Sequence, residues 1–291
     1  MGIVSDVRGM HLGSRFGVVE SESADFDVGI VENLLREGHH DGAVAYVIRG
    51  AVPAGVCETV HTNFRKIISD EGSQRDLHDI IKADQIGSTQ FKKSGQEYAL
   101  NTARVQASML SLFDGLSAGE TSRFMLDDEL RDGFLARGFH FGPARFKSTY
   151  SNHCTIRAWL VNGEMSLQPH EDISQVEAAR ADEFEIQTTG ENTMSFNICV
   201  RSDGTGGEVR VWDLRPSPET RRSLGLYETG YPYPAGFVED IPSTTIGLEP
   251  GDSYFLNASF LHGVQPVVGE RITAGRFMGL SDDEHRVMFW T

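Results

Sequence analysis

Two segments of the sequence carry residue types that together could bind a metal ion. The first contains His170 and Asp172, and the second, much later in the chain, contains His262. Side chains at positions i and i+2 of an extended strand point to the same face, so His170 and Asp172 could share one ion. Two imidazoles and one carboxylate form a facial triad, which is typical of non-haem Fe(II) centres and leaves coordination positions open for ligands.

The context of these segments favours a site over a chance pair. Pro169 ends a strand-like run and a long loop follows Asp172, so His170 and Asp172 are expected at the mouth of a strand. A turn at 250–252 and an apolar strand precede His262, which we expect to open another strand. For most of the other histidines we expect structural roles: His39, His40, His61, His78, His140, His153 and His285.

An arginine that follows His262 could bind an acidic ligand of the metal. Arg271 begins an alternating strand, which we expect to pair antiparallel with the strand after His262 through the turn Gly269–Glu270. A buried guanidinium requires an anionic partner, and a dicarboxylate would supply one. Arg276 is the rival for this role. Arg157 lies on the strand before the first metal segment, and either a cavity that holds co-substrate or substrate, or a solvated strand face, is compatible with it.

Size and composition restrict the class of protein. The chain has 291 residues, 39% of them hydrophobic, a mean hydropathy of −0.29 and a net charge of −16. The acidic balance argues against nucleic acid and against an anionic membrane surface as partners. Isolated cysteines without a CxxC motif, no recognisable secretory signal and no long apolar run predict reduced thiols, a cytoplasmic location and no membrane span.

The first half of the sequence is patterned largely for helices. Residues 1–28 are polar and weakly patterned, which predicts a loosely docked entry, and residues 41–49 predict a short strand. Pro53 is expected to open an amphipathic helix, and further helices are expected at 103–116 and 124–137.

From about residue 145, short β-type runs alternate with Gly, Pro and Asp. The predicted strands are 155–161, 165–170, 193–201, 207–213, 244–248, 252–256, 264–268, 271–280 and 287–290. Strands that follow a helical first half predict a mainly β protein with flanking helices, built as a sandwich or jelly roll. We expect one catalytic domain over 1–291, in which a helical and mixed part, 1–144, packs on the core, 145–291.

The segment from about 145 to 290 resembles the double-stranded β-helix (jelly roll, cupin-like) core of Fe(II)/2-oxoglutarate-dependent oxygenases. The motifs occur in the family order: His-x-Asp at 170–172, Gly-Gly-Glu-Val-Arg-Val at 206–211 and the distal His262. The run from His262 to Arg271 is especially similar to prolyl-hydroxylase-type members, in which a basic residue at this offset binds the distal carboxylate of 2-oxoglutarate.

The resemblance implies Fe(II) as cofactor, with 2-oxoglutarate and O2 as co-substrates. The implied metal ligands are His170, Asp172 and His262. The implied anchor of the co-substrate is Arg271, assisted by Thr273.

Segments around these motifs also resemble carrier-independent halogenases that act on indole alkaloids. The similar stretches are Thr155–Arg157 and 194–214. Those halogenases carry a glycine where this sequence has Asp172, and the glycine vacates a coordination position for chloride. Because Asp172 fills that position, the resemblance implies hydroxylation of an aliphatic C–H of a small molecule, such as an amino-acid derivative or a natural-product intermediate.

Several alternatives stay open at this point. A desaturase or cyclase of the same family would use the same residues. A 2-oxoglutarate-independent cupin-type metalloenzyme would not require Arg271, and a non-catalytic barrel would not require the triad. A homodimer is also compatible with the sequence. The loops 173–192 and 215–243 would help to set the substrate, and their candidate lid residues are Tyr227, Tyr231, Tyr233 and Phe237.

Overall fold

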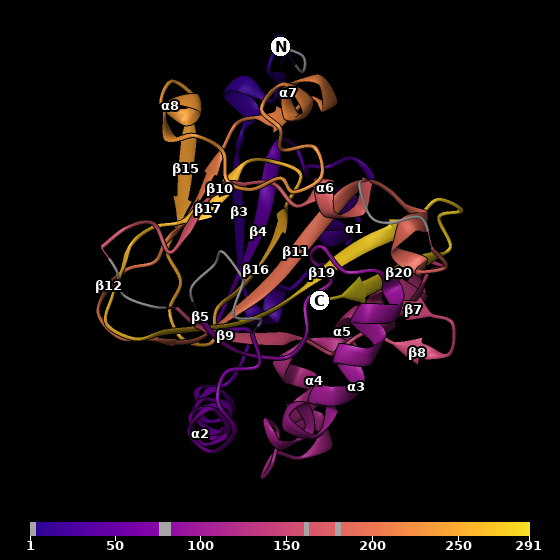
Figure 1. The fold of residues 1–291 in the computed structure, drawn as a ribbon, viewed down its shortest axis with the longest axis vertical. Coiled ribbons are helices and arrows are strands. Elements are labelled where there is room, and N and C mark those ends of the chain that lie inside the picture. The colour runs from indigo at the N-terminus through magenta and orange to yellow at the C-terminus, as the bar shows by residue number, and fades with distance from the viewer. Residues whose placement is uncertain (1–3, 76–82, 160–162, 178–181) are drawn as a thin grey trace.

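The computed structural model describes residues 4–75, 83–159, 163–177 and 182–291 (Figure 1). Within these ranges, no helix is both long enough and apolar enough to cross a membrane. His78 and the end of the strand predicted at 155–161 lie outside the described residues.

The chain alternates short helices with many strands. The α-helices are α1 (Val28–Arg36), α2 (Ala54–Glu71), α3 (Gly95–Ser111), α4 (Ala118–Phe124), α5 (Asp127–Ala136), α6 (Ile173–Glu177), α7 (Pro218–Ser223) and α8 (Ala235–Val238). The strands are β1 (Val4–Ser5), β2 (Gly9–His11), β3 (Gly17–Glu22), β4 (Ala43–Arg49), β5 (Ala83–Ile86), β6 (His140–Pro143), β7 (Arg145–Phe146), β8 (Thr149–Tyr150), β9 (Thr155–Trp159), β10 (Leu167–His170), β11 (Thr189–Ser202), β12 (Thr205–Gly206), β13 (Val209–Trp212), β14 (Arg215–Pro216), β15 (Ser243–Ile246), β16 (Ser253–Asn257), β17 (His262–Val264), β18 (Val267–Val268), β19 (Arg271–Ser281) and β20 (Arg286–Trp290). Every strand predicted between 155 and 290 overlaps at least one of these.

Two sheets form the centre of the molecule. A nine-stranded sheet has the order β3-β4-β16-β11-β19-β20-β6, with β9 pairing with β19 and β5 pairing with β9, and a four-stranded sheet has the order β10-β17-β13-β15. One apolar cluster joins the sheets: Val47 and Leu256 come from the larger sheet, and Val209, Val211 and Ile246 come from the smaller one. The sheets therefore face each other, as expected for a jelly roll.

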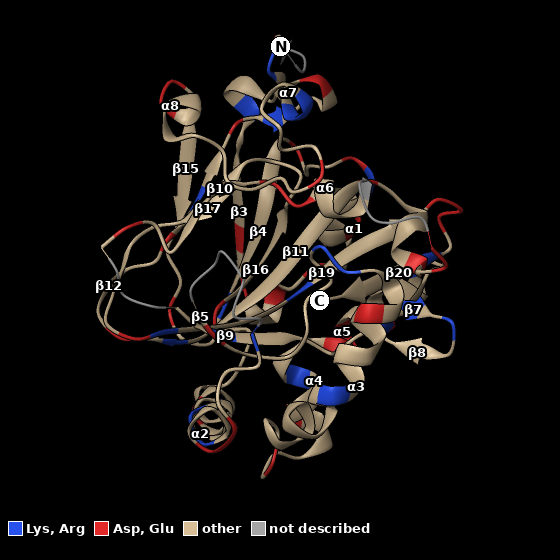
Figure 2. Ribbon diagram, in the orientation of Figure 1, with Lys and Arg blue, Asp and Glu red and all other residues tan. Residues whose placement is uncertain are grey.

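Helices cover the other face of the nine-stranded sheet. Phe196 and Ile198 of β11 and Ile272 of β19 pack in one cluster with Val31 of α1 and Phe64 of α2. Because side chains alternate along a strand, neighbouring residues of β11 and β19 point toward the four-stranded sheet. The central strands β4, β11 and β16 are free of charged residues along most of their length (Figure 2), as is expected for strands that are covered on both faces.

The helix predicted at Pro53 is confirmed as α2, whereas two other predictions need correction. Helix α3 begins earlier than predicted, because Ser94 and Glu97 form a capping box at its start. The helix predicted at 124–137 corresponds to α5, which begins three residues later than predicted, and the separate helix α4, which ends at Phe124, was not predicted. The two helices are separated at Leu126, which adopts a left-handed conformation with φ 53°.

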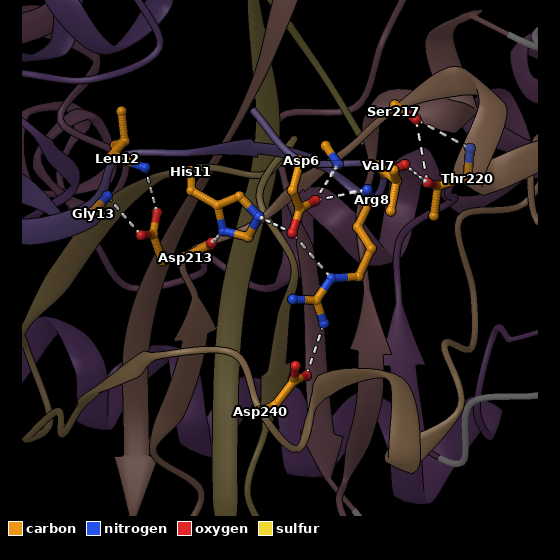
Figure 3. Close-up of polar contacts among 11 residues, drawn as sticks. Asp6, Val7, Arg8, His11, Leu12, Gly13, Asp213, Ser217, Thr220 and Asp240 are labelled. Carbon is orange, nitrogen blue, oxygen red and sulfur yellow. Dashed lines mark hydrogen bonds and ion pairs between the residues drawn. The ribbon is translucent and has the colours of Figure 1, made fainter. Parts of the chain in front are cut away.

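The prediction of a loosely docked entry at 1–28 is wrong for its described part. Strand β3 pairs in parallel with β4 inside the nine-stranded sheet, and β2 pairs with β14. The carboxylate of Asp213 accepts hydrogen bonds from the backbone N–H groups of Leu12 (2.7 Å) and Gly13 (2.8 Å), while Nδ1 of His11 lies 2.5 Å from the Asp213 carbonyl oxygen (Figure 3). Leu12 is also buried in the apolar cluster between the sheets, with Met10, Phe16 and Val18 packed against it, so polar and apolar contacts together hold this segment.

The predicted hairpin between the strand after His262 and the strand of Arg271 is also wrong. Strand β17 pairs with β10 and β13, whereas β19 pairs with β11, β9 and β20 in the other sheet. The turn at Gly269 (φ 96°) lies between them, and a Cβ there would be 1.8 Å from the Asp203 carbonyl oxygen. Consecutive strands of a jelly roll alternate between two sheets, so a tight turn here does not produce a hairpin.

The part of the chain before residue 145 contributes strands as well as helices to this architecture. Strands β3, β4, β5 and β6 belong to the nine-stranded sheet. The single catalytic domain over 1–291, with its division into 1–144 and 145–291, stays a prediction.

Candidate metal and co-substrate site

The structure brings His170, Asp172 and His262 together. His170 at the end of β10 and His262 at the start of β17 are direct partners across the two strands, and their ring centroids are 4.0 Å apart. Oδ2 of Asp172 lies 3.2 Å from Nε2 of His262 and 3.9 Å from Nε2 of His170. One nitrogen or oxygen from each residue falls within 4.8 Å of the others, so the three could hold one ion.

Hydrogen bonds orient both imidazoles for metal binding. Nδ1 of His170 donates to the carbonyl oxygen of Gln168, and Nδ1 of His262 donates to the carbonyl oxygen of Phe260, both at 2.9 Å. A carbonyl oxygen can only accept, so the ring proton lies on Nδ1 and the lone pair of Nε2 faces Asp172. This arrangement is typical of metal-binding histidines.

The protonation states also suit a metal. Burial, together with the nearby His262, lowers the pKa of His170 to about 4, so its imidazole is neutral at neutral pH. Burial acts to raise the pKa of Asp172, but the contacts with His170 and His262 and the charge of Arg157 lower it overall. Gln175 donates from its amide to Oδ1 of Asp172, which leaves Oδ2 toward the imidazoles. Two neutral imidazoles and one carboxylate are the donor set that Fe(II) takes in a facial triad.

A cavity extends from this cluster along the inner face of the nine-stranded sheet. Most of the residues of β9, β11 and β19 that line it are odd-numbered, whereas their apolar even-numbered neighbours pack on the helix-covered face of the sheet. The odd-numbered lining residues are Thr155, Arg157, Trp159, Ser195, Asn197, Arg271, Thr273, Gly275 and Phe277, and the even-numbered Arg276 also borders the cavity. The cavity is therefore lined by polar residues of one sheet and by the metal cluster of the other.

Arg271 has the properties expected of an anchor for an acidic ligand. Its side chain lines the cavity, only 4% of the residue is exposed, and Nη1 has no hydrogen-bond partner among the described residues. Burial lowers the pKa of Arg271. A guanidinium stays charged at neutral pH, and a buried charge of this kind requires an anion.

Arg276, the rival candidate, already has a protein partner. Its Nη1 donates to Asp127 of α5 at 2.8 Å, and its Nη2 donates to the carbonyl oxygen of Met125 at 3.0 Å. Its guanidinium also lies 4.1 Å from the ring centroid of Phe289. Arg276 therefore joins the sheet to the helices.

The two secondary candidates, Thr273 and Arg157, both line the cavity. Oγ1 of Thr273 accepts a hydrogen bond from Nε1 of Trp159 at 2.9 Å, so its own hydroxyl proton stays available. Arg157 lies directly opposite Thr273 in the pairing of β9 with β19, and its Nε donates to Oε1 of Gln85 at 2.8 Å.

Gly207 and Gln175 support the site and were missed from the sequence. In the sequence the glycine pair at 206–207 stands out only as part of the family motif. Gly207 has φ 76°, and a Cβ there would lie 2.6 Å from Cδ of Arg271, so this glycine makes room for the anchor. The only signal for Gln175 is its position three residues after Asp172, in the middle of α6.

Of the four aromatic lid candidates, Tyr231 alone is among the described residues that line the cavity. Its ring packs edge-on against His170, with centroids 5.8 Å apart. Tyr233 and Phe237 instead pack against each other, and Tyr227 stacks with Arg222.

Comparisons with known proteins agree with this geometry. Residues 45–291 match the family of the carrier-protein-independent halogenase WelO5. The chain is 41% identical to the L-isoleucine 3(1)-dioxygenase of Pantoea ananatis. The alignment spans 279 residues, or 96% of this chain and 94% of that protein.

Solved structures share the fold. The crystal structure of an N-substituted L-amino acid dioxygenase from Burkholderia ambifaria has a TM-score of 0.56 at 15% identity and covers 91% of both chains. The complex of that enzyme with α-ketoglutarate has a TM-score of 0.52 at 17% identity, again over 91% of both chains.

The predicted fold class, mainly β with flanking helices and a double-stranded β-helix core, is confirmed. So are the cofactors, Fe(II) with 2-oxoglutarate and O2 as co-substrates. The chain therefore belongs to the family of the carrier-protein-independent halogenase WelO5, and it is an enzyme of the Fe(II)/2-oxoglutarate-dependent oxygenase superfamily.

Proposed function

We propose that this enzyme hydroxylates an aliphatic C–H of a free L-amino acid with a branched side chain, such as L-isoleucine. The observation that carries the proposal is one cavity that contains both a His–Asp–His cluster and a buried arginine with an unpartnered Nη1. The similarity to an L-isoleucine 3(1)-dioxygenase over nearly the whole chain supports the substrate class.

Each candidate residue has a separate role in this proposal. The metal ligands are Nε2 of His170, Nε2 of His262 and Oδ2 of Asp172. Arg271 binds the distal carboxylate of 2-oxoglutarate as a fork, and the Thr273 hydroxyl donates to the same group. Arg157 binds an acidic group of co-substrate or substrate.

The protein positions the reactants and excludes water. Iron, 2-oxoglutarate and dioxygen, when bound, supply an oxidant that replaces an aliphatic C–H by C–OH, while 2-oxoglutarate leaves as succinate and carbon dioxide. The hydrogen bonds on Nδ1 hold both imidazoles in place during this reaction. Apolar residues in the cavity suit carbon chains: Phe91, Leu167, Val209, Val264 and Phe277.

Asp172 favours hydroxylation over halogenation. The resemblance to halogenases implies a glycine at this position, where a chloride ion would complete the coordination. Here the Asp172 carboxylate is buried, accepts a hydrogen bond from Gln175 and lies 3.2 Å from His262. A third protein ligand occupies the position that chloride would need.

The test is an anaerobic titration of the metal-free protein with Fe(II) and then 2-oxoglutarate, which follows the weak visible charge-transfer band of the chelate. We expect the band only with both additions, and its loss in Asp172→Ala. Asp114→Ala is the matched control, because it removes an exposed carboxylate from a turn outside the cavity. Iron binding without a band would contradict the co-substrate role, and no iron binding would contradict the metal site.

Turnover then tests the substrate class. We expect L-isoleucine to stimulate succinate formation in air and to yield a product that has gained one oxygen atom. A product that has lost two hydrogens would mean desaturation, and chlorination in the presence of chloride would contradict the role of Asp172. The predicted homodimer and cytoplasmic location stay predictions.

A further inference from the structure

Two arginines from different segments meet beside the metal cluster. Nε of Arg157 and Nη1 of Arg75 donate to the same atom, Oε1 of Gln85, at 2.8 Å and 2.9 Å. Both arginines line the cavity that contains His170 and His262. Like charges repel, so two guanidiniums that share one acceptor are unfavourable by themselves. An anion that binds both of them would offset this repulsion.

Gln85 is fixed for this task. It lies directly opposite Arg157 in the pairing of β5 with β9, and only 2% of the residue is exposed. Its Nε2 donates to the carbonyl oxygen of Gly87 at 2.8 Å, which turns Oε1 toward the arginines. The amide is neutral, so it positions both cations without removing either charge.

Each guanidinium has five N–H donors, and Gln85 accepts one from each. Arg75 and Arg157 each also have at least one further interaction within the protein. Both side chains line the cavity, where a ligand would meet them. Two adjacent guanidiniums match a planar carboxylate, which can accept from both at once.

The pair shares its cavity with the metal cluster. Arg75 and Arg157 line it together with Asp172 and with Tyr231, whose ring packs against His170. Arg271 is the more deeply buried cation, with one unpartnered nitrogen that suits the distal carboxylate of the co-substrate. A second carboxylate, that of the substrate, then fits the pair.

We infer that Arg75 and Arg157, positioned by Gln85, bind the α-carboxylate of the substrate, so that the enzyme selects molecules with a free carboxylate. This inference rests on the proposed function. It narrows the role of Arg157 from either acidic ligand to the substrate. A substrate anchored there by its carboxylate presents its side chain toward the cluster of His170, Asp172 and His262.

The experiment compares L-isoleucine with its neutral amide, L-isoleucinamide, which differs only at the carboxylate. Binding is followed anaerobically, as the change that each compound causes in the charge-transfer band of the protein loaded with Fe(II) and 2-oxoglutarate. We expect the wild-type protein to bind the acid at least about tenfold more tightly than the amide, because charge-assisted hydrogen bonds are lost with the amide.

The variants are Arg157→Gln and Arg75→Gln, with Arg104→Gln on the exposed face of α3 as a control for the loss of one positive charge. We expect both cavity variants to weaken binding of the acid by about tenfold to a hundredfold and binding of the amide by less than about twofold. Titration with 2-oxoglutarate should be unchanged, which also shows that each variant is folded. Arg157→Lys should restore part of the affinity for the acid.

Each other outcome has a separate meaning. Equal weakening of acid and amide would overturn carboxylate recognition by the pair. A shift of the 2-oxoglutarate titration in both variants, with unchanged binding of the acid, would assign the pair to the co-substrate and also overturn the inference. If no amino acid alters the band of the loaded wild-type protein or is oxidised by it, the proposed substrate class itself fails. If one variant does not fold, the other still gives the same comparison.

Discussion

Arg271 and Arg276 lie on the same strand, β19, yet they meet opposite surroundings. Arg276 points to the helix-covered face, where Asp127 and the Met125 carbonyl oxygen accept its hydrogen bonds. Arg271 points to the face that looks onto the four-stranded sheet, where its Nη1 has no partner among the described residues. Both arginines are buried, so their difference lies in the partner and not in exposure.

This difference separates a structural cation from a ligand site. A buried charge that is paired within the protein joins two elements. Removing it leaves its partner as an uncompensated charge, which destabilises the fold. A buried charge without a protein partner is unfavourable until a ligand arrives, so a protein retains one where binding requires it. The two faces of β19 therefore divide into a stabilising face and a ligand-binding face.

The largest expected effect is the loss of stability in Arg276→Met. The variant leaves Asp127 without its cation and removes a guanidinium that lies 4.1 Å from the ring centroid of Phe289. We expect the free energy of unfolding to fall by about 3 kcal/mol. Urea denaturation of the metal-free protein measures it. A free energy of unfolding equal to that of the wild-type protein would mean that Arg276 does not stabilise the fold.

Arg271→Gln should show the reverse pattern. Loss of the charged fork should weaken binding of 2-oxoglutarate by about 2 kcal/mol, or roughly thirtyfold. The free energy of unfolding should stay the same or rise, because an unpartnered buried cation has been removed. Titration of the charge-transfer band measures the first effect and urea denaturation the second. A normal titration in this variant would move the anchoring role to another arginine.

Gly207→Ala tests whether the space around Arg271 matters as well as its charge. The new Cβ would lie 2.6 Å from Cδ of Arg271, on a backbone with φ 76°. We expect a loss of stability of about 1 kcal/mol and a few-fold weaker binding of 2-oxoglutarate. Gly225→Ala is the matched control, because its φ of 71° is similar but its Cβ would meet no heavy atom within 4 Å. Equal binding by both variants would exclude a role of Gly207 in placing the arginine.

The smallest expected effect concerns the pH dependence of stability that His153 causes on the helix-covered face of the nine-stranded sheet. Burial and the charge of Arg276 lower the pKa of His153, although Asp127 acts to raise it. As the pH falls below the ordinary histidine pKa of about 6.5, the unfolded chain takes up this proton before the folded protein does, so stability is lost. Between about pH 7.5 and 5.5 we expect His153→Phe to lose less unfolding free energy than the wild-type protein, as measured by urea denaturation. An equal loss in the two proteins would show that His153 does not cause this pH dependence.

Sequence patterns were sufficient for the chemistry of the site. The His-x-Asp spacing, the distal histidine and the arginine after it pointed to four residues that the structure places in one cavity, but not to Gln175 or Arg75, which line the same cavity. Strand alternation could also have separated Arg271 from Arg276, since an odd and an even position on one strand point to opposite faces.

Other features depended on contacts between distant segments. The sequence around Arg75 and Gln85 carries no recognisable motif, because their role arises from the pairing of β5 with β9. The docking of the first residues was missed because strand pairing and Asp213 hold them together with a few scattered apolar side chains, such as Leu12 and Val18, which form no regular pattern.

The sequence by itself determined the candidate ligand residues, the strand-rich second half and the family, because local residue spacing encodes them. Only the tertiary structure decided which strands share a sheet, and hence that His170 faces His262 across one sheet while Arg271 approaches from the other. It also decided which buried arginine has a partner. Both are properties of long-range pairing, in which the neighbour of a residue is set by the fold and not by its position in the chain.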